Sequence, residues 1–188
     1  MQAALERASG SLGVRLLQEA YNVQSLSLYA SLGFEVRELY AVMAGAPKSR
    51  LSLPDWETRP MTERDLPECV ALHERIHGYS RKNELADALH AGTAVVAVKG
   101  GQVRAYMSFP TNWLANHGVA EADEDMEALL IGAAQIARLP LSFLLPVRRG
   151  TLFCWCLAQG LRAIKPMTLM TIGEYRQPHE VHSPSVSY

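Results

Sequence analysis

The two ends of this 188-residue chain repeat one order of elements, and no other feature constrains the fold as strongly. A shift of 127 residues superposes a helix, a strand, a second helix, a glycine and a second strand at matching lengths. Few superposed residues are identical, so chance agreement is the alternative. A true repeat would mean one full unit preceded by the second half of another. The superposed positions are 1–8 with 128–135, 14–17 with 141–144, Gly33 with Gly160 and Met43 with Met170.

A segment rich in proline and serine, residues 46–55, separates the two copies. This composition is typical of a linker. We therefore expect the C-terminal half of a first domain at 1–45, a second domain at 56–176 and a tail at 177–188. The tail is polar and contains two prolines, which predicts that it packs loosely, if at all.

Apolar spacing and turn residues predict helices and strands along the whole chain. Residues 66–76 carry apolar side chains at helical spacing, and Lys-Gly-Gly-Gln at 99–102 is typical of a hairpin turn. Residues 110–125 follow neither pattern and are expected to be irregular. The predicted strands are 14–17, 34–43, 56–60, 93–98, 103–109, 141–147 and 166–172, and the predicted helices are 1–8, 23–32, 66–76, 81–90, 126–137 and 151–159.

The composition is that of an ordinary globular protein, with 48% apolar residues, 20% charged residues and a formal net charge of -1. That charge gives no electrostatic reason to expect nucleic acid or an anionic membrane as a partner. No apolar run reaches the roughly 18 residues that a membrane span needs, and the first residues lack the pattern of a signal peptide. A cytoplasmic location is the expectation.

Cysteine and histidine spacing gives little support for a metal site. Cys154 and Cys156 are one residue apart rather than the two to four usual for zinc, so two half-buried helical thiols are the better interpretation. His73 and His77 would share one helix face, but a third ligand at a sensible distance is missing. We therefore expect no metal, and a solvated or half-buried histidine pair.

Residues 22–34, Asn-Val-Gln-Ser-Leu-Ser-Leu-Tyr-Ala-Ser-Leu-Gly-Phe, resemble the last helix and turn of GNAT N-acetyltransferases. The resemblance implies an α/β fold of the α+β kind with a mixed sheet, acetyl-CoA as cosubstrate, and a small-molecule or peptide amine as acceptor. It also implies that Asn22 and Ser25 contact the cofactor and that Tyr29 protonates the leaving thiolate. A phenol suits that role because its pKa, near 10, is close to that of a thiol. Without the resemblance, Asn22 would be a helix cap and Tyr29 a core residue.

The chain departs from the family pattern in both copies. The glycine-rich loop that grips the coenzyme A pyrophosphate would lie before residue 1 in the first copy. In the second copy, residues 116–125 hold one glycine and several acids, which would repel a phosphate. The repeat places Arg149 opposite Asn22 and Cys156 opposite Tyr29, so the second copy looks degenerate. Cys156 is either a replacement acid or simply packed.

Two further roles follow from the resemblance. His117 and Glu121 are candidates for the general base that takes the proton of the amine. Arg149, at the start of a predicted helix, is a candidate for binding coenzyme A, with an exposed helix start as the alternative.

Three interpretations of function remain open at this point. In the first, the chain is an N-acetyltransferase. In the second, it is a non-catalytic acyl-CoA-sensing or structural module. In the third, residue 1 is not the biological start, and the chain is a piece of a longer enzyme that is inactive in this truncated form. Strands 14–17 and 34–43 would leave exposed sheet edges, so they should pack onto the second domain or onto a second chain in a homo-oligomer.

Overall fold

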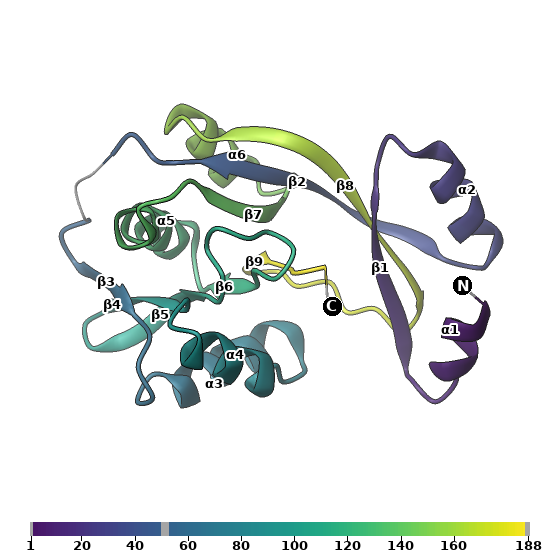
Figure 1. The fold of residues 1–188 in the computed structure, drawn as a ribbon, viewed down its shortest axis with the longest axis horizontal. Helices are drawn as coiled ribbons and strands as arrows, with labels where there is room; N and C mark the ends of the chain where they lie inside the picture. The colour runs from purple at the N-terminus through teal and green to yellow at the C-terminus, as the bar shows by residue number, and fades with distance from the viewer. Residues whose placement is uncertain (1, 50–52, 187–188) are drawn as a thin grey trace.

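The structure is a computed structural model that describes residues 2–49 and 53–186. Its strands form two sheets, one ordered β1-β8-β2-β7 and one ordered β3-β4-β5-β6-β9 (Figure 1). The strands are β1 Gly13–Glu19, β2 Glu35–Gly45, β3 Trp56–Pro60, β4 Val95–Lys99, β5 Gln102–Met107, β6 Gly118–Ala120, β7 Leu141–Pro146, β8 Arg162–Gly173 and β9 Val181–Ser183. The helices are α1 Gln2–Arg7, α2 Val23–Ser31, α3 Leu66–His77, α4 Lys82–His90, α5 Asp123–Ala137 and α6 Gly150–Ala158.

The four-stranded sheet interleaves strands from the two halves of the sequence. The last strand of each half lies between strands of the other half, because β8 pairs with both β1 and β2, and β2 pairs with both β8 and β7. The expectation that strands 14–17 and 34–43 pack onto the second domain is therefore met within this chain. The two halves share one sheet.

The strand registers of this sheet obey the 127-residue shift found in the sequence. Val14 pairs with Ile172, and moving the first up by 127 and the second down by 127 gives Leu141 and Gly45, which also pair. The pair Tyr40–Met167 maps onto itself. A pseudo-twofold axis thus passes through the sheet between these two residues.

The irregularities of the sheet follow the same symmetry. The β2–β8 register slips by one residue at Arg37 and again at Ile164, and these bulged positions are 127 residues apart. Helices α2 and α6 also end alike. Gly33 has φ +92° and Gly160 φ +96°, a left-handed conformation that glycine adopts without strain and that ends a helix.

Helices cover both faces of the five-stranded sheet. Helices α3 and α4 pack on the face that carries Val96 and Tyr106, whereas α5 packs on the opposite face with Val95 and Met107. Strand β7 and helix α6 add to the cluster on the α5 side, so the main core lies between the two sheets.

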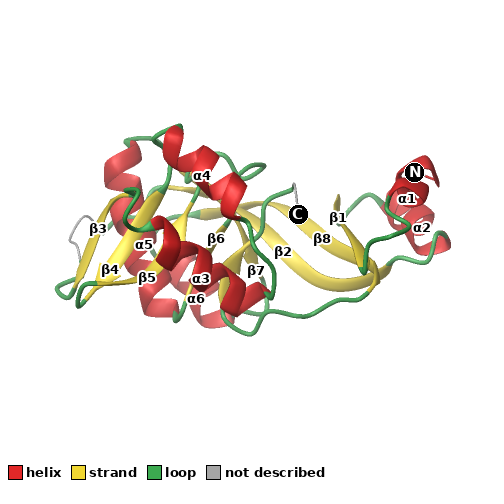
Figure 2. Cartoon of the chain, turned by 90° about the horizontal axis from the view of Figure 1, so that it is seen from below, coloured by secondary structure: helices red, strands yellow, loops and turns green. Residues whose placement is uncertain are grey.

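The first part of the chain, from α1 to the start of β2, forms an arm that extends away from this core, whereas the end of β2 lies within it. Both views place α1 and α2 at the far end of the molecule from β3, β4 and β5 (Figures 1 and 2). Helix α2 has no buried residue, and Val23 and Leu28 are more than half exposed, at 66% and 52%. The arm therefore presents an open apolar face.

Three expectations are wrong. Every strand pair among the described residues is antiparallel, so the sheets are not mixed. The stretch 110–125 contains a short strand, β6, and the tail is not loose, because Val181–Ser183 form β9 and are buried.

None of the helices in the described part of the chain is long and apolar enough to cross a membrane.

Candidate functional site

Helix α2 begins and ends on the residues that the sequence marked. The Oδ1 atom of Asn22 accepts a hydrogen bond from the backbone N–H of Ser25 at 3.0 Å, so Asn22 caps the helix. At the other end, the N–H of Phe34 donates to the carbonyl of Tyr29 at 3.0 Å, and the two rings meet edge to face at 6.1 Å. Tyr29 is half-buried, and its orientation is fixed by this turn.

His117 lies at the start of β6 in a fully buried network. Its backbone N–H donates to Ser108 Oγ at 2.9 Å, and its Nδ1 lies 3.0 Å from the same oxygen. Burial, with the nearby Arg81 guanidinium, lowers the pKa of His117 to about 2. The ring is therefore neutral at physiological pH, and its Nε2 is buried with no hydrogen-bond partner among the described residues.

Three more buried histidines gather around His117, and we call His73, His77, His117 and His182 the histidine cluster. His73 stacks on His77 with ring centroids 4.4 Å apart, and His182 meets His77 edge-on at 5.4 Å. Burial lowers the pKa of His73 to about 3, of His77 to about 2 and of His182 to about 4. The expected solvated or half-buried pair at 73 and 77 is thus a buried part of a larger cluster.

The histidine cluster is not arranged as a metal site. Among the residues that the structure describes, no three His, Cys, Asp or Glu side chains are placed to hold one ion together. The cysteines of the CWC segment also differ from expectation, because Cys156 is fully buried and Cys154 is exposed.

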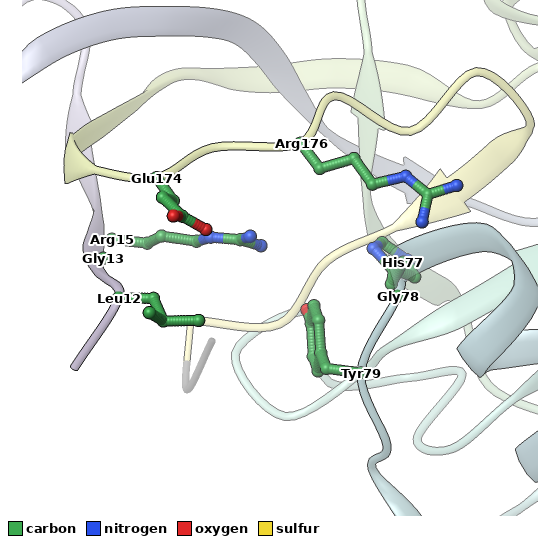
Figure 3. Close-up of a pocket in the computed structure, with 8 residues that line it drawn as sticks. All are labelled: Leu12, Gly13, Arg15, His77, Gly78, Tyr79, Glu174 and Arg176. Atoms are coloured by element: carbon green, nitrogen blue, oxygen red, sulfur yellow. The ribbon is translucent and has the colours of Figure 1, made fainter.

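A cavity of about 550 Å³ opens beside the cluster, between the arm and the end of α3 (Figure 3). Its walls combine charge and aromatic surface, with the Arg15 guanidinium 5.4 Å from the centre of the Tyr79 ring. His77 reaches the cavity from the cluster. The lining residues are Leu12, Gly13, Arg15, His77, Gly78, Tyr79, Glu174 and Arg176.

Glu121 is held in ion pairs away from His117. The two residues flank β6, four positions apart, which along a strand is about 13 Å. The Glu121 carboxylate pairs with Arg75 and Arg104. These two arginines compensate the negative charge of Glu121.

Arg149 and Cys156 occupy the second-unit positions opposite Asn22 and Tyr29, with different surroundings. Arg149 pairs with Asp123 and donates to the carbonyl of His179 at 3.2 Å. Burial raises the pKa of the Cys156 thiol to about 12. Its position in the main core matches the packed interpretation rather than that of a replacement acid.

The six predicted site residues do not form one site. Asn22, Ser25 and Tyr29 share α2 at the end of the arm, whereas His117, Glu121 and Arg149 belong to the body around β6 and α6 (Figure 1). The sequence pointed to His117 and to the pair His73 and His77, but it missed His182 and the gathering of all four in one buried cluster. A histidine in a three-residue strand carries no periodic signal that could have indicated it.

Comparison with known proteins gives matches only at the level of structure. No family model and no curated protein sequence matches the chain. A candidate acetyltransferase from Pyrococcus horikoshii superposes with a TM-score of 0.75 at 12% identity, over 98% of this chain and 62% of that one. A GCN5-related N-acetyltransferase from Sphaerobacter thermophilus superposes with a TM-score of 0.57 at 15% identity, over 92% and 64%. The fold is that of the GNAT acetyltransferases.

A third structure of the same fold comes from a functionally unknown conserved protein of Staphylococcus epidermidis. It superposes with a TM-score of 0.55 at 10% identity, over 93% of this chain and 77% of that one. This chain thus spans less than two thirds of the length of the Pyrococcus and Sphaerobacter proteins. Because the same two superpositions cover 98% and 92% of this chain, the GNAT fold extends over both its arm and its body.

Proposed function

We propose that this chain acts in an acetyl-CoA-dependent N-acetyltransferase that transfers an acetyl group to a primary amine, and that Tyr29 is its general acid. The observation that carries the proposal is a difference between α2 and α6, the helices that occupy matching positions in the two halves of a GNAT fold. Asn22 caps an exposed helix of the arm and Tyr29 is half-buried on that helix, whereas their counterparts Arg149 and Cys156 are ion-paired or buried.

The matched registers of β1–β8 and β2–β7 support the further proposal that the chain consists of two related units. The second unit, residues 56–176, would then serve as a scaffold. Its last strand, β8, pairs with both strands of the arm and thereby positions α2.

The chemistry follows from where a proton is needed. The amine nitrogen attacks the thioester carbonyl, and the C–S bond breaks as the tetrahedral intermediate collapses. The hydroxyl of Tyr29 gives its proton to the leaving sulfur, and the phenolate regains one from solvent. The proton lost by the nitrogen goes to solvent or to a base, and a positioned acid accelerates such a step by about 100-fold or more.

His117 and Glu121 are proposed here as bases only for a ligand bound near β6. Both flank β6, whereas Tyr29 belongs to α2 at the end of the arm (Figure 1), and the low pKa of His117 makes it a weak proton acceptor. The amine acceptor at Tyr29 would reach the open face of α2 instead.

The test combines binding and turnover in the full chain. Calorimetric titration with acetyl-CoA should show saturable binding, and Tyr29→Phe should keep that binding while lowering kcat by about 100-fold. Tyr21→Phe is the matched control, because this exposed tyrosine lies on the same arm outside α2, and its kcat should be unchanged. No binding at millimolar acetyl-CoA, or equal loss in both variants, would overturn the proposal.

A further inference from the structure

Two cavities occupy matching positions in the two halves of the molecule. We call the cavity of about 550 Å³ between the arm and the end of α3 the α3 cavity, and a second one of about 500 Å³ beside the end of α5 the α5 cavity. Under the 127-residue shift, Leu12 of the α3 cavity matches Leu139 of the α5 cavity, and both side chains are exposed. Gly13 likewise matches Pro140. Each cavity lies where an outer strand of the four-stranded sheet begins beside the end of its neighbour.

The charged residues of the α3 cavity are not a requirement of this backbone. Glu174 matches Pro47 of the α5 cavity. Arg176 matches Ser49 there, and Arg15 matches a serine in β7. Because neutral residues form the same strand ends around the α5 cavity, the sheet does not need the three charged side chains. These charges therefore distinguish the α3 cavity from its counterpart and point to a charged ligand.

Aromatic rings position Arg15 in the wall of the α3 cavity. Its guanidinium carbon lies 5.4 Å from the centre of the Tyr79 ring and 5.4 Å from the centre of the Tyr175 ring. The Tyr79 ring is itself held by His73, whose ring meets it edge to face at 5.4 Å. A guanidinium that lies over a ring still directs N–H groups along its own plane. Arg15 is thus a fixed donor at the edge of the cavity.

The glycine that ends α3 positions Arg176. Gly78 has φ +80°, and a Cβ atom there would lie 3.0 Å from Nη1 of Arg176. The missing side chain lets the guanidinium lie against the end of α3, where Figure 3 shows it beside Gly78 and His77. Within the described part of the chain, the Arg176 side chain has no hydrogen bond or ion pair. Its charge is therefore not compensated by a carboxylate of the protein.

The walls of the α3 cavity carry one net positive charge. Arg15 and Arg176 contribute two positive charges and Glu174 one negative charge. His77 adds none, because burial lowers its pKa to about 2 and keeps the ring neutral. A single carboxylate would balance this charge, and guanidinium groups bind carboxylates through paired N–H donors. The Tyr79 ring adds apolar surface, and the volume lies within the roughly 300–1,000 Å³ of small-molecule sites.

We propose that the α3 cavity binds a small organic carboxylate with a flat apolar part. Arg15 and Arg176 bind the carboxylate group, and the apolar part lies on the Tyr79 ring beside Leu12. The site requires both halves of the chain, because Arg15 comes from β1, Tyr79 follows α3 and Arg176 follows β8. Its ligand is separate from the acetyl transfer proposed above, since Tyr29 is not among the described residues that line the cavity.

Titration of the isotope-labelled full chain with benzoate, followed by NMR, tests the site without acetyl-CoA. The amide signals of Gly13 and Gly78 should shift and saturate, whereas those of Ala46 and Ser49 in the α5 cavity should not move. Benzyl alcohol, which has the ring without the charge, should bind about 10-fold more weakly or worse. Equal affinity for benzoate and benzyl alcohol, or equal shifts at both cavities, would overturn the proposal.

Arginine variants test which cavity holds the carboxylate. Arg176→Met removes an exposed charge and should weaken benzoate binding about 10-fold while leaving the free energy of unfolding unchanged. Arg138→Met is the matched control, because Arg138 is the one charged residue in the described lining of the α5 cavity, and its benzoate affinity should equal that of the wild type. Equal affinity in the Arg176→Met protein and the wild type overturns the assignment.

A second anion tests the charge balance. Phenyl phosphate carries nearly two negative charges at pH 8, so the wild type should bind it more weakly than benzoate, and Glu174→Gln should bind it more tightly than the wild type does. A wild-type preference for phenyl phosphate overturns the carboxylate assignment. Benzoate binding without Tyr29-dependent acetyl transfer would overturn the proposed function and leave this site standing.

Discussion

The arm and the second unit hold matching elements in very different surroundings. Phe143 in β7 is 1% exposed, while Leu16, at the matching position of β1, is only half-buried. Cys156 is fully buried in α6, while Tyr29 in α2 is half-buried. The local sequence therefore determines the element, and its neighbours determine how much of it is buried.

The same contrast is visible in the choice of residue at one helix position. Gly132 in α5 lies against Thr58 of β3, and a Cβ there would fall 2.2 Å from the threonine Cβ. The matching residue in α1 is Leu5. A glycine is needed where a strand crosses closely, and a leucine is accommodated where the arm is open.

Acid should produce the largest effect and should act on the second unit. Three members of the histidine cluster lie there and the fourth, His182, lies in the tail strand that pairs with β6, whereas residues 1–45 contain no histidine. Their pKa values in the folded state, about 2 to 4, are below 6.5, so the unfolded state binds more protons as pH falls below 6.5. At pH 5.5 each buried ring should cost about 1 kcal/mol, or about 4 kcal/mol together.

Urea unfolding at pH 7.5 and pH 5.5 measures this loss of stability. His90 is exposed, so His90→Gln should leave the difference between the two pH values unchanged. An unfolding free energy that is equal at both pH values would contradict the burial of neutral rings. Amide exchange should rise first in α3 and β6 if the second unit is the sensitive part.

A matched pair of leucines tests whether burial differs between the two halves as the structure indicates. Leu144 in β7 is completely buried, and Leu17 is its partly buried counterpart in β1. Leu144→Ala should lower the free energy of unfolding by about 3 kcal/mol, because a closed core cannot fill the cavity. Leu17→Ala should cost about 1 kcal/mol on the basis of area. Equal losses in urea titrations would remove the distinction between arm and body.

Gly132→Ala should destabilise by about 2 kcal/mol, because the added methyl group meets Thr58. The double variant Gly132→Ala with Thr58→Ser removes one methyl group of Thr58 and should recover part of the loss. Leu5→Ala is the arm control and should cost about 1 kcal/mol or less, because Leu5 is only half-buried. A neutral Gly132→Ala in thermal unfolding would show that β3 can shift away from α5.

The smallest expected effect is at the cap of α2. Asn22→Ala removes the acceptor for the Ser25 N–H and should cost about 1 kcal/mol or less, since the helix is exposed. Asn22→Ser should restore most of it. A loss of acetyl-CoA affinity in Asn22→Ser, whose cap is intact, would separate a ligand contact from the capping role.

Local signals in the sequence predicted much of the fold. The helix at 23–32 and the strand at 34–43 differ from α2 and β2 by at most two residues, because Asn22 and Gly33 mark the ends of α2 chemically. The linker also begins where β2 ends. These features depend on neighbours a few residues apart, which a single sequence records.

Nonlocal features could not be predicted in this way. The interleaving of β2 and β8 depends on pairing between strands more than 100 residues apart, and nothing local in either strand specifies its partner. Strand β9 is three residues long and mostly polar, so neither alternation nor hydrophobicity distinguishes it from a loose tail. The histidine cluster forms only because β6, β9 and α3 meet.

The interleaved sheet also means that the linker does not mark a boundary in space. Each half contributes its last strand to the other, so separating the halves would break all three strand pairings and leave the edges of four strands unpaired. A gene split within the linker should therefore still give two polypeptides that fold only as a pair. Neither half is therefore expected to fold alone, and the linker joins two parts of one folding unit.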